Sequence, residues 1–358
     1  MLIYIDNTIA EFLKKNELND EQIMLFNDLA TANKRGLCIA CGHVKSLDLL
    51  IEHENIVGGI MKSLRGNATE FKTIAEIVDC VFVLTSSEYT RKRNLPKIIR
   101  NKVRLLPIED ATRWRLGNAC SLIGENPRDC DFYNIVGHYF CFSHGIRGIS
   151  IKFSPENGGG GSTGDIMIRC VRNLNKFALC IVDRDWRYGQ IAEGDDPESG
   201  GTFIAAKKAE EELKQSGLEN YFQLFPLEVH EAENLIPFSV LEQLSDTDCS
   251  PQGRDLISKL RSIQGGEPIR YLDFKKKMKS GYNVSYDMYW EPIRMELGND
   301  SWDKTFYPVG RKVLEKATVH MKNANYGELI IDDYLKDAWS QLGKVLFSWG
   351  CATIPTSA

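Results

Sequence analysis

Acidic residues directly follow three apolar runs in the middle third of the chain. They are Glu125 after residues 120–123, Asp183 and Asp185 after residues 177–182, and Glu228, Glu231 and Glu233 after residues 221–227. Carboxylate oxygens are the ligands that Mg²⁺ prefers in proteins. Several carboxylates held close together without a cation would repel one another, and their pKa values would rise. The pattern therefore predicts a shared metal site at these acids.

The two acids of Asp183-Arg184-Asp185 have the spacing of side chains on one face of a strand. They face the same way for as long as the strand geometry persists, because side chains alternate along a strand. They can then reach one ion or two neighbouring ions. A metal pair would orient an attacking water and stabilise the leaving oxygen of an in-line displacement. A single Asp at a strand end is commonly a helix cap or a turn residue, but the joint placement of several acids favours the metal site.

The elements expected to position these acids alternate between strands and helices. Strands are predicted at residues 120–123, 149–153, 177–182 and 221–227, and helices at residues 129–142, 165–174 and 202–215. Alternation at this spacing indicates right-handed crossovers and a parallel sheet. Ligands of parallel sheets gather outside the carboxyl ends of the strands, where the acids stand.

The predicted fold class is α/β, in three domains, with a central parallel sheet flanked by helices. The N-terminal domain, residues 1–115, has predicted strands at 2–5 and 81–84 and predicted helices at 20–33 and 44–54. We expect this α/β domain to recognise a partner or a target. The central domain covers residues 116–240. The C-terminal domain, residues 241–358, is mostly helical, and we expect it to form a core of its own around Tyr286, Tyr289, Trp290, Trp339, Phe347 and Trp349.

Composition and charge set limits on the class of protein. The hydrophobic share of 43% and the charged share of 26% are ordinary for a globular protein. Ten scattered cysteines point to reduced thiols, and with no signal peptide and no long apolar stretch the expected location is the cytoplasm rather than a membrane. A net charge of −5 argues against coating nucleic acid by charge alone. It does not exclude an enzyme whose site is a carboxylate cluster.

Three segments of the central domain resemble motifs of the Toprim family. Residues 122–129, Leu-Ile-Gly-Glu-Asn-Pro-Arg-Asp, look like the first Toprim motif, a strand followed by Glu-Gly-x-x-Asp. Residues 180–185, Cys-Ile-Val-Asp-Arg-Asp, look like the Asp-x-Asp strand. Residues 231–235, Glu-Ala-Glu-Asn-Leu, resemble the Glu-Asn segment of Toprim nucleases in bacterial anti-phage systems, of which the OLD-like nucleases are the nearest group. The resemblance covers residues 116–240.

This resemblance implies a Toprim-like sheet and an endonuclease that depends on Mg²⁺, with Mn²⁺ able to substitute. Glu125 would be a general base or a metal ligand, and Asp183 and Asp185 would be metal ligands. Glu231 or Glu233 would complete the catalytic set. The implied role is that of a toxic effector or a DNA-cutting subunit in prokaryotic anti-phage defence.

The resemblance also implies substrate contacts and partners. Asp129 and Arg184 lie within the motifs and are expected to contact nucleic acid. DNA is the favoured substrate; structured RNA such as tRNA, and a Toprim scaffold that binds without cutting, are the alternatives. Asn126 stands where the family usually has Gly, a residue that permits positive φ, and this departure favours the scaffold. The chain has no Walker motif, so an ATPase or sensor would be a separate subunit, and assembly into a homo-oligomer stays open.

Two further segments are candidates for substrate contacts. The glycine-rich residues 158–164 lack the lysine of a P-loop. We expect a flexible loop beside the site in which Gly159 and Gly160 hold a phosphate through backbone amides, a plain connector being the alternative. Residues 91–104 contain seven basic residues and no acidic one. They could follow a phosphate backbone through Arg91, Lys92 and Arg93, dock an acidic partner, or stay solvated.

Two other patterns carry little weight. Cys38-Ile-Ala-Cys41-Gly-His43 has no second cysteine pair to complete four zinc ligands, so buried cysteines are expected there. Residues 1–6 resemble the opening strand of PIN-type nucleases with Asp6 as its acid. No second acidic motif follows at a convincing place in the first hundred residues.

Overall fold

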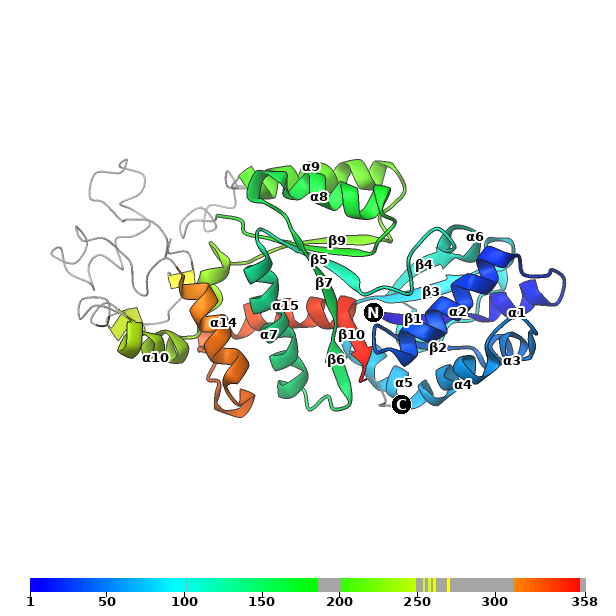
Figure 1. Ribbon diagram of the computed structural model, residues 1–358, viewed down its shortest axis with the longest axis horizontal. Helices are drawn as coiled ribbons and strands as arrows, with labels where there is room; N and C mark the ends of the chain where they lie inside the picture. Colours follow the sequence, from blue (N-terminus) through cyan, green and yellow to red (C-terminus); the bar gives the residue numbers. More distant parts are fainter. Residues whose placement is uncertain are drawn as a thin grey trace.

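Two parallel β-sheets of four strands each form the framework of the protein (Figure 1). The computed structural model describes residues 1–100, 102–185, 201–248 and 312–354, together with residues 254, 257, 258, 260, 261, 269 and 270. The expected aromatic cluster of Tyr286, Tyr289 and Trp290 lies outside these residues. Helices flank the sheets, so the α/β class with parallel sheets is confirmed.

The first sheet has the strand order β2-β1-β3-β4. Its strands are β1 (Leu2–Ile5), β2 (Ile39–Gly42), β3 (Val81–Thr85) and β4 (Val103–Pro107), and its helices are α1 (Asn7–Leu13), α2 (Asp20–Lys34), α3 (Val44–Glu52), α4 (Gly58–Gly66), α5 (Ala68–Ile77) and α6 (Ile108–Ala111). Strands β1 and β3 are buried along their whole length, as strands covered on both faces must be. Helix α2 begins at a capping box in which Asn19 and Gln22 bond each other's backbone N–H.

Strand β2 contains most of the Cys-x-x-Cys segment. Cys38, just before the strand, is 0% exposed and Cys41 is 4% exposed. Burial raises the pKa of the Cys38 thiol to about 12, which keeps it protonated. These cysteines are therefore core residues of the first sheet, as expected.

The second sheet has the strand order β7-β5-β8-β9 and is also parallel. Its strands are β5 (Cys120–Gly124), β7 (Phe153–Asn157), β8 (Ala178–Val182) and β9 (Phe222–Pro226). Its helices are α7 (Pro127–Ser143), α8 (Thr163–Ile168), which continues into a π-helical turn (Arg169–Asn173), and α9 (Gly201–Gln215). In each sheet the second strand along the chain (β2 or β7) lies on one side of the first strand (β1 or β5). The third strand (β3 or β8) lies on the other side of the first strand. The crevice between the first and third strands, β1 and β3 or β5 and β8, is where such sheets bind ligands.

The strand expected at residues 149–153 is in fact two strands. Residues Ile149–Ile151 form β6, which pairs antiparallel with the late strand β10 (Cys351–Thr353), and β7 begins at Phe153. Lys152 lies between them and donates its N–H to the Gly350 carbonyl at 2.8 Å. The chain therefore changes partners at Lys152.

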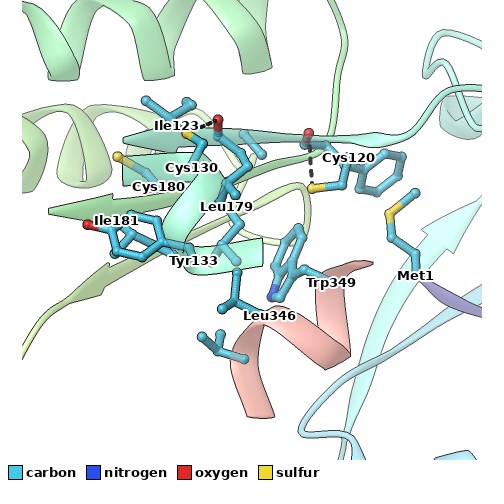
Figure 2. Packing of buried hydrophobic residues seen from close by; sticks show 14 of the residues in the cluster. Met1, Cys120, Ile123, Cys130, Tyr133, Leu179, Cys180, Ile181, Leu346 and Trp349 are labelled. Atoms are coloured by element: carbon cyan, nitrogen blue, oxygen red, sulfur yellow. Dashed lines mark hydrogen bonds between the residues drawn. The ribbon is translucent and has the colours of Figure 1, made fainter. Parts of the chain in front are cut away.

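The C-terminal helices are α10 (Phe238–Asp248), α14 (Val313–Asn323) and α15 (Lys336–Gly350). Of these, α15 packs against α7, β6 and β10, α14 packs on α7, and α10 packs on α14. Trp349 at the end of α15 packs edge-on against Phe82 of β3 at 5.2 Å between ring centres, and its Nε1 donates to Gln223 of β9 at 2.7 Å. Figure 2 shows Trp349 close to Leu346 and beside residues of the second sheet. The aromatic residues of α15 thus join the core of the sheets instead of forming an appended one.

None of the helices in the described ranges is long and apolar enough to cross a membrane.

Candidate functional site

Three adjacent strands of the second sheet bring the expected acids to one edge. Strands β5 and β8 are neighbours, with Ile123 opposite Cys180, and β9 lies on the other side of β8. Glu125 comes directly after β5 and Asp183 directly after β8. Because parallel strands end at the same edge, both carboxylates stand at the crevice between the first and third strands of this sheet.

A buried tyrosine lies beneath these carboxylates. Tyr133 on α7 is 1% exposed, and its pKa is raised well above the ordinary value, first by burial and then by the negative charges of Asp183, Asp129 and Glu125. The charges of three carboxylates, from two strand ends and one helix, therefore act on a single buried hydroxyl. Sequence reasoning did not select Tyr133. Its spacing of four residues from Asp129, which places the two on one helix face, was the available signal.

The acids differ in their surroundings. Four of them are buried, with exposed fractions of 5% to 7%, and these are Asp129, Asp183, Glu231 and Glu233. Glu125 is half-buried and Asp185 is exposed. Buried carboxylates need hydrogen bonds, a paired charge or a cation, because desolvation opposes the charged form. The edge is thus suited to hold positive charge.

The condition under which Asp183 and Asp185 would face the same way, a strand that continues through both residues, is not met. Strand β8 ends at Val182, and Asp185 has a φ of 53°, in the left-handed region. Alternation along a strand therefore does not extend to these residues. The Asp185 N–H donates to the His230 carbonyl at 3.1 Å, so its backbone is tied to the segment after β9 while its side chain is exposed.

Glu231 and Glu233 have different local roles. The Glu231 side chain accepts from the Asn234 N–H, and Asn234 Oδ1 accepts from the Glu231 N–H at 3.0 Å. Glu231 therefore caps the 3-10 turn Ala232–Leu235. Glu233 lines a pocket next to the strand ends. Of the two, Glu233 is better placed to meet a substrate.

Asn126 is the N-cap of α7. Its side chain accepts from the N–H groups of Arg128 and Asp129, and the Asp129 carboxylate accepts from the Asn126 N–H at 3.0 Å. The backbone of Asn126 is extended, with a φ of −143°, so this position does not require the positive φ that glycine permits. The departure from the family's usual glycine is therefore compatible with the site.

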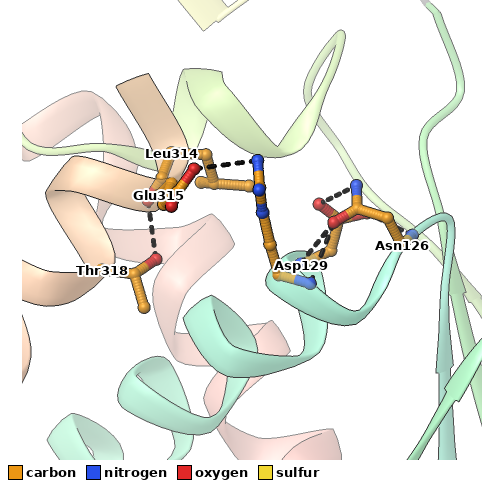
Figure 3. A network of polar contacts seen from close by, with 6 residues as sticks. Asn126, Asp129, Leu314, Glu315 and Thr318 are labelled. Carbon is orange, nitrogen blue, oxygen red and sulfur yellow. Dashed lines mark hydrogen bonds and ion pairs between the residues drawn. The ribbon is translucent and has the colours of Figure 1, made fainter. Parts of the chain in front are cut away.

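An open pocket of about 370 Å³ adjoins this capping box and the acidic edge. It is lined by Asn126, Arg128, Asp129, Glu233, Lys312 and Glu315, among others. Figure 3 shows Asn126 and Asp129 on the first turn of α7 facing Glu315 of α14. An ion pair of 2.8 Å joins Arg128 to Glu315 across it. The pocket thus has both cationic and anionic walls.

The glycine-rich segment packs closely on the end of β5. The N–H groups of Gly158 and Gly159 donate to the carbonyls of Gly124 and Glu125 at 2.8 and 2.9 Å. A Cβ on Gly158 would lie 2.6 Å from both the Gly124 carbonyl oxygen and Thr163 Oγ1. The amide of Gly159 is therefore already used and is not available to hold a phosphate, contrary to expectation. Gly160, which like Gly159 has a positive φ, keeps its predicted role untested.

The basic segment lies elsewhere. The 3-10 turn Ser87–Lys92 packs against α1, which lies at the outer end of the first sheet, whereas α7 lies near the middle of the molecule (Figure 1). Arg91, Lys92 and Arg93 are therefore not brought together with the acids. Arg104, the last basic residue of the run, donates to the carbonyls of Glu219 and Phe222 at 2.6 and 2.9 Å. Arg104 therefore stabilises the fold and is not part of an exposed basic face.

Arg184, in contrast, is at the site. It lies between buried Asp183 and exposed Asp185, and its guanidinium stands 5.6 Å from the ring centre of Phe203 on α9. A cation over an aromatic face is held in place without losing its charge. Arg184 can therefore present positive charge at the mouth of the acidic edge.

This geometry reduces the set of side chains that can hold the predicted metal ion. Within the described ranges, no three His, Cys, Asp or Glu side chains are arranged to hold one ion together. Mg²⁺ commonly takes only one or two protein carboxylates and completes its shell with water and phosphate oxygens. Glu125 and Asp183, on adjacent strands, are the pair best placed for this.

No protein-family model, no curated protein and no solved structure matches the chain.

Proposed function

We propose that the chain is a Toprim-type endonuclease that cleaves phosphodiester bonds of nucleic acid with Mg²⁺, DNA being the favoured substrate. The observation that carries the proposal is the convergence of Glu125 and Asp183 at the ends of the adjacent parallel strands β5 and β8. This convergence lies at the crevice of a parallel sheet, next to an open pocket. Such crevices are where α/β sheets bind their ligands.

The donor set fits Mg²⁺ or Mn²⁺. Glu125, Asp183 and Asp185 offer oxygen donors, which suit a hard divalent cation. Glu125 and Asp183 would hold it, and Asp185 could join from the exposed side. Bound there, the ion would activate a water and stabilise charge on the leaving oxygen.

The chain's own residues supply positioning and proton transfer. Glu125 is half-buried and borders solvent, so it can accept the proton of an attacking water. Arg184 presents its charge at the mouth of the edge, where it can bind a substrate phosphate. Glu233 and Asp129 wall the pocket and orient what enters it.

A scaffold that binds nucleic acid without cutting is less well supported. The feature that favoured it was Asn126 in place of glycine, and Asn126 fits the site in an extended conformation. An effector role in anti-phage defence, with a separate ATPase or sensor subunit, remains part of the same proposal.

The test compares cleavage of plasmid DNA and of total tRNA by the wild type and by Asp183→Asn, each with Mg²⁺, with Mn²⁺ and with EDTA. We expect metal-dependent cleavage that falls about 100-fold or more in the variant, the low end of what a catalytic carboxylate contributes. The control is Asp131→Asn, which removes an exposed acid of α7 that is ion-paired only at the surface with Lys322.

The outcome that overturns the proposal is cleavage at the same rate in Asp183→Asn, or no metal-dependent cleavage of either substrate by the wild type. Melting curves of each variant show whether the fold is intact. Cleavage of tRNA but not of DNA would show that RNA is the substrate and would leave the proposed site unchanged.

A further inference from the structure

The first sheet carries a second polar crevice at its own carboxyl edge. Its strand order is the same as that of the second sheet, and its first strand, β1, is likewise followed directly by an acid, Asp6. His43 follows β2, and Ser86 follows β3. Asp6 therefore stands at the point of this sheet where ligands are bound in related architectures.

Asp6 is fully buried, and only half of its carboxylate is used. Its Oδ1 accepts from the Thr8 N–H at 2.6 Å and from the Thr8 hydroxyl, which makes Asp6 the N-cap of α1. Its Oδ2 is buried and has no hydrogen-bond partner among the described residues. A buried acceptor without a donor destabilises a protein. Helix capping explains Oδ1 and leaves Oδ2 unexplained.

Two further buried polar atoms near Asp6 also have no hydrogen-bond partner among the described residues. They are His43 Nδ1 and Arg93 Nη1. Both residues act on Asp6 electrostatically, because their positive charges lower its pKa against the larger effect of burial. An acceptor, a donor and an imidazole nitrogen thus gather at one strand end with their bonding capacity unused.

The backbone explains why these residues meet. The His43 N–H donates to the Ile5 carbonyl at 2.7 Å, which places the end of β2 beside Asp6. The Asn94 N–H donates to Asn7 Oδ1 at 2.8 Å, which brings the segment of Arg93 over the start of α1. Both contacts fix main-chain atoms, so the three side chains are held near one another by the fold.

The opposite wall of the crevice is satisfied internally. The Thr8 and Thr85 hydroxyls are 2.9 Å apart, and the Ser86 N–H donates to the Thr8 hydroxyl at 3.0 Å. Ser86 and Ser87 donate in turn to the Glu109 carboxylate. This wall is polar and preorganised. The unused capacity lies on the side of Asp6, Arg93 and His43.

We propose that this edge is a second binding site, separate from the acidic edge of the second sheet, for a mononucleotide. A ribose hydroxyl donates to Asp6 Oδ2, and the phosphate binds the Arg93 guanidinium. A ligand of this class supplies in one molecule the donor that Asp6 lacks and the acceptor that Arg93 lacks. Because Asp6 is fully buried, the segment of residues 87–94 has to shift for the ligand to enter. The site does not depend on the proposed nuclease activity.

The test is calorimetric titration of the full chain with AMP, ADP and ATP in EDTA, with adenosine and inorganic phosphate as partial probes. We expect at least one nucleotide to bind the wild type more tightly than adenosine or phosphate. Asp6→Asn and Arg93→Gln should each weaken that binding by about tenfold or more, the equivalent of about 1.4 kcal/mol for a lost charged hydrogen bond.

Two controls separate this site from other charges. Lys97→Gln removes an exposed cation of the same basic run, and Asp183→Asn alters the other edge; both should bind the nucleotide as the wild type does. The proposal is overturned if no nucleotide binds the wild type, since water then meets these atoms, or if Arg93→Gln, folded by its melting curve, binds unchanged. Binding lost in Asp183→Asn instead would assign the nucleotide to the other sheet.

Discussion

Asn126 and Asp129 hold each other across the first turn of α7. The Asn126 N–H donates to Asp129 Oδ2 at 3.0 Å, and the Asn126 side-chain amide donates to Asp129 Oδ1 at 2.7 Å. Both oxygens of Asp129 are therefore engaged by the residue directly after Glu125. The pair fixes where α7 begins, and with it the wall of the pocket and the position of Tyr133.

Asn126→Ala should lower the free energy of unfolding by about 1 kcal/mol, the usual loss when a helix N-cap is removed. Asn126→Ser should retain most of the stability, because a serine hydroxyl also accepts from the first turn. Urea unfolding of both variants measures the difference. Equal stability of the Ala and Ser variants would show that the cap seen in the structure contributes little.

Gly158→Ala should destabilise the protein by about 1–3 kcal/mol, the range for forcing an atom into a packed region. The added Cβ would lie 2.6 Å from the Gly124 carbonyl and from the Thr163 hydroxyl. Gly161→Ala in the same run is the matched control, because a Cβ there meets nothing within 4 Å. Thermal melting compares the two. If both variants melt with the wild type, the segment is the loose connector that the sequence also allowed.

Glu233→Gln should lower cleavage by about 100-fold while leaving the melting temperature unchanged, since it alters a wall of the pocket without changing its shape. Glu231→Ala should instead lower stability by about 0.5–2 kcal/mol, because Glu231 caps the turn Ala232–Leu235. Initial rates and melting curves of both variants are compared. A loss of stability in Glu233→Gln and a loss of cleavage alone in Glu231→Ala would show that Glu233 is the structural residue and Glu231 the one that acts in cleavage.

The stability contributed by Asp6 should depend on pH with a defined sign. Burial raises its pKa above the ordinary value of 3.8, so the folded state binds the proton more tightly than the unfolded state. Its contribution is therefore fully present below that value and is lost as pH rises through the folded pKa. Asp6→Asn cannot titrate, so its stability relative to the wild type should increase from about pH 4 upward.

The measurement is urea unfolding of both proteins at several values from about pH 4 to pH 5.5, a range that begins near the ordinary pKa of an aspartate. The charges of Arg93 and His43 lower the pKa of Asp6 against the larger effect of burial. A difference in unfolding free energy that does not change with pH would contradict the raised pKa.

The strands that carry the acids could be located from the sequence. Strand β8 was predicted at residues 177–182 and observed at Ala178–Val182, because a short run of apolar residues bounded by turn residues is distinctive. Strand β4 was missed. It lies inside the basic run. Its Arg104 donates hydrogen bonds to main-chain carbonyls at the second sheet, and no local sequence pattern reveals such a tertiary contact.

The acids at the strand ends of the candidate site could be predicted from the sequence, but the residues that line its pocket could not. Glu125 and Asp183 follow adjacent strands as expected, since sheet topology alone brings them together. The pocket needs Lys312 and Glu315 from α14, far along the chain, and the left-handed φ of Asp185 ends the alternation that the spacing suggested. Both depend on long-range packing or on one backbone torsion, neither of which periodicity encodes.

The position of Trp349 has a consequence for the order in which the protein is made. Its ring packs on Phe82 of the first sheet and bonds Gln223 of the second, yet it is among the last of the described residues to leave the ribosome. Both sheets must wait, with this part of their shared core open, until α15 has been synthesised. A chain cut short before α15 should therefore be prone to aggregate, and the second sheet should acquire its final support only once α15 has been made.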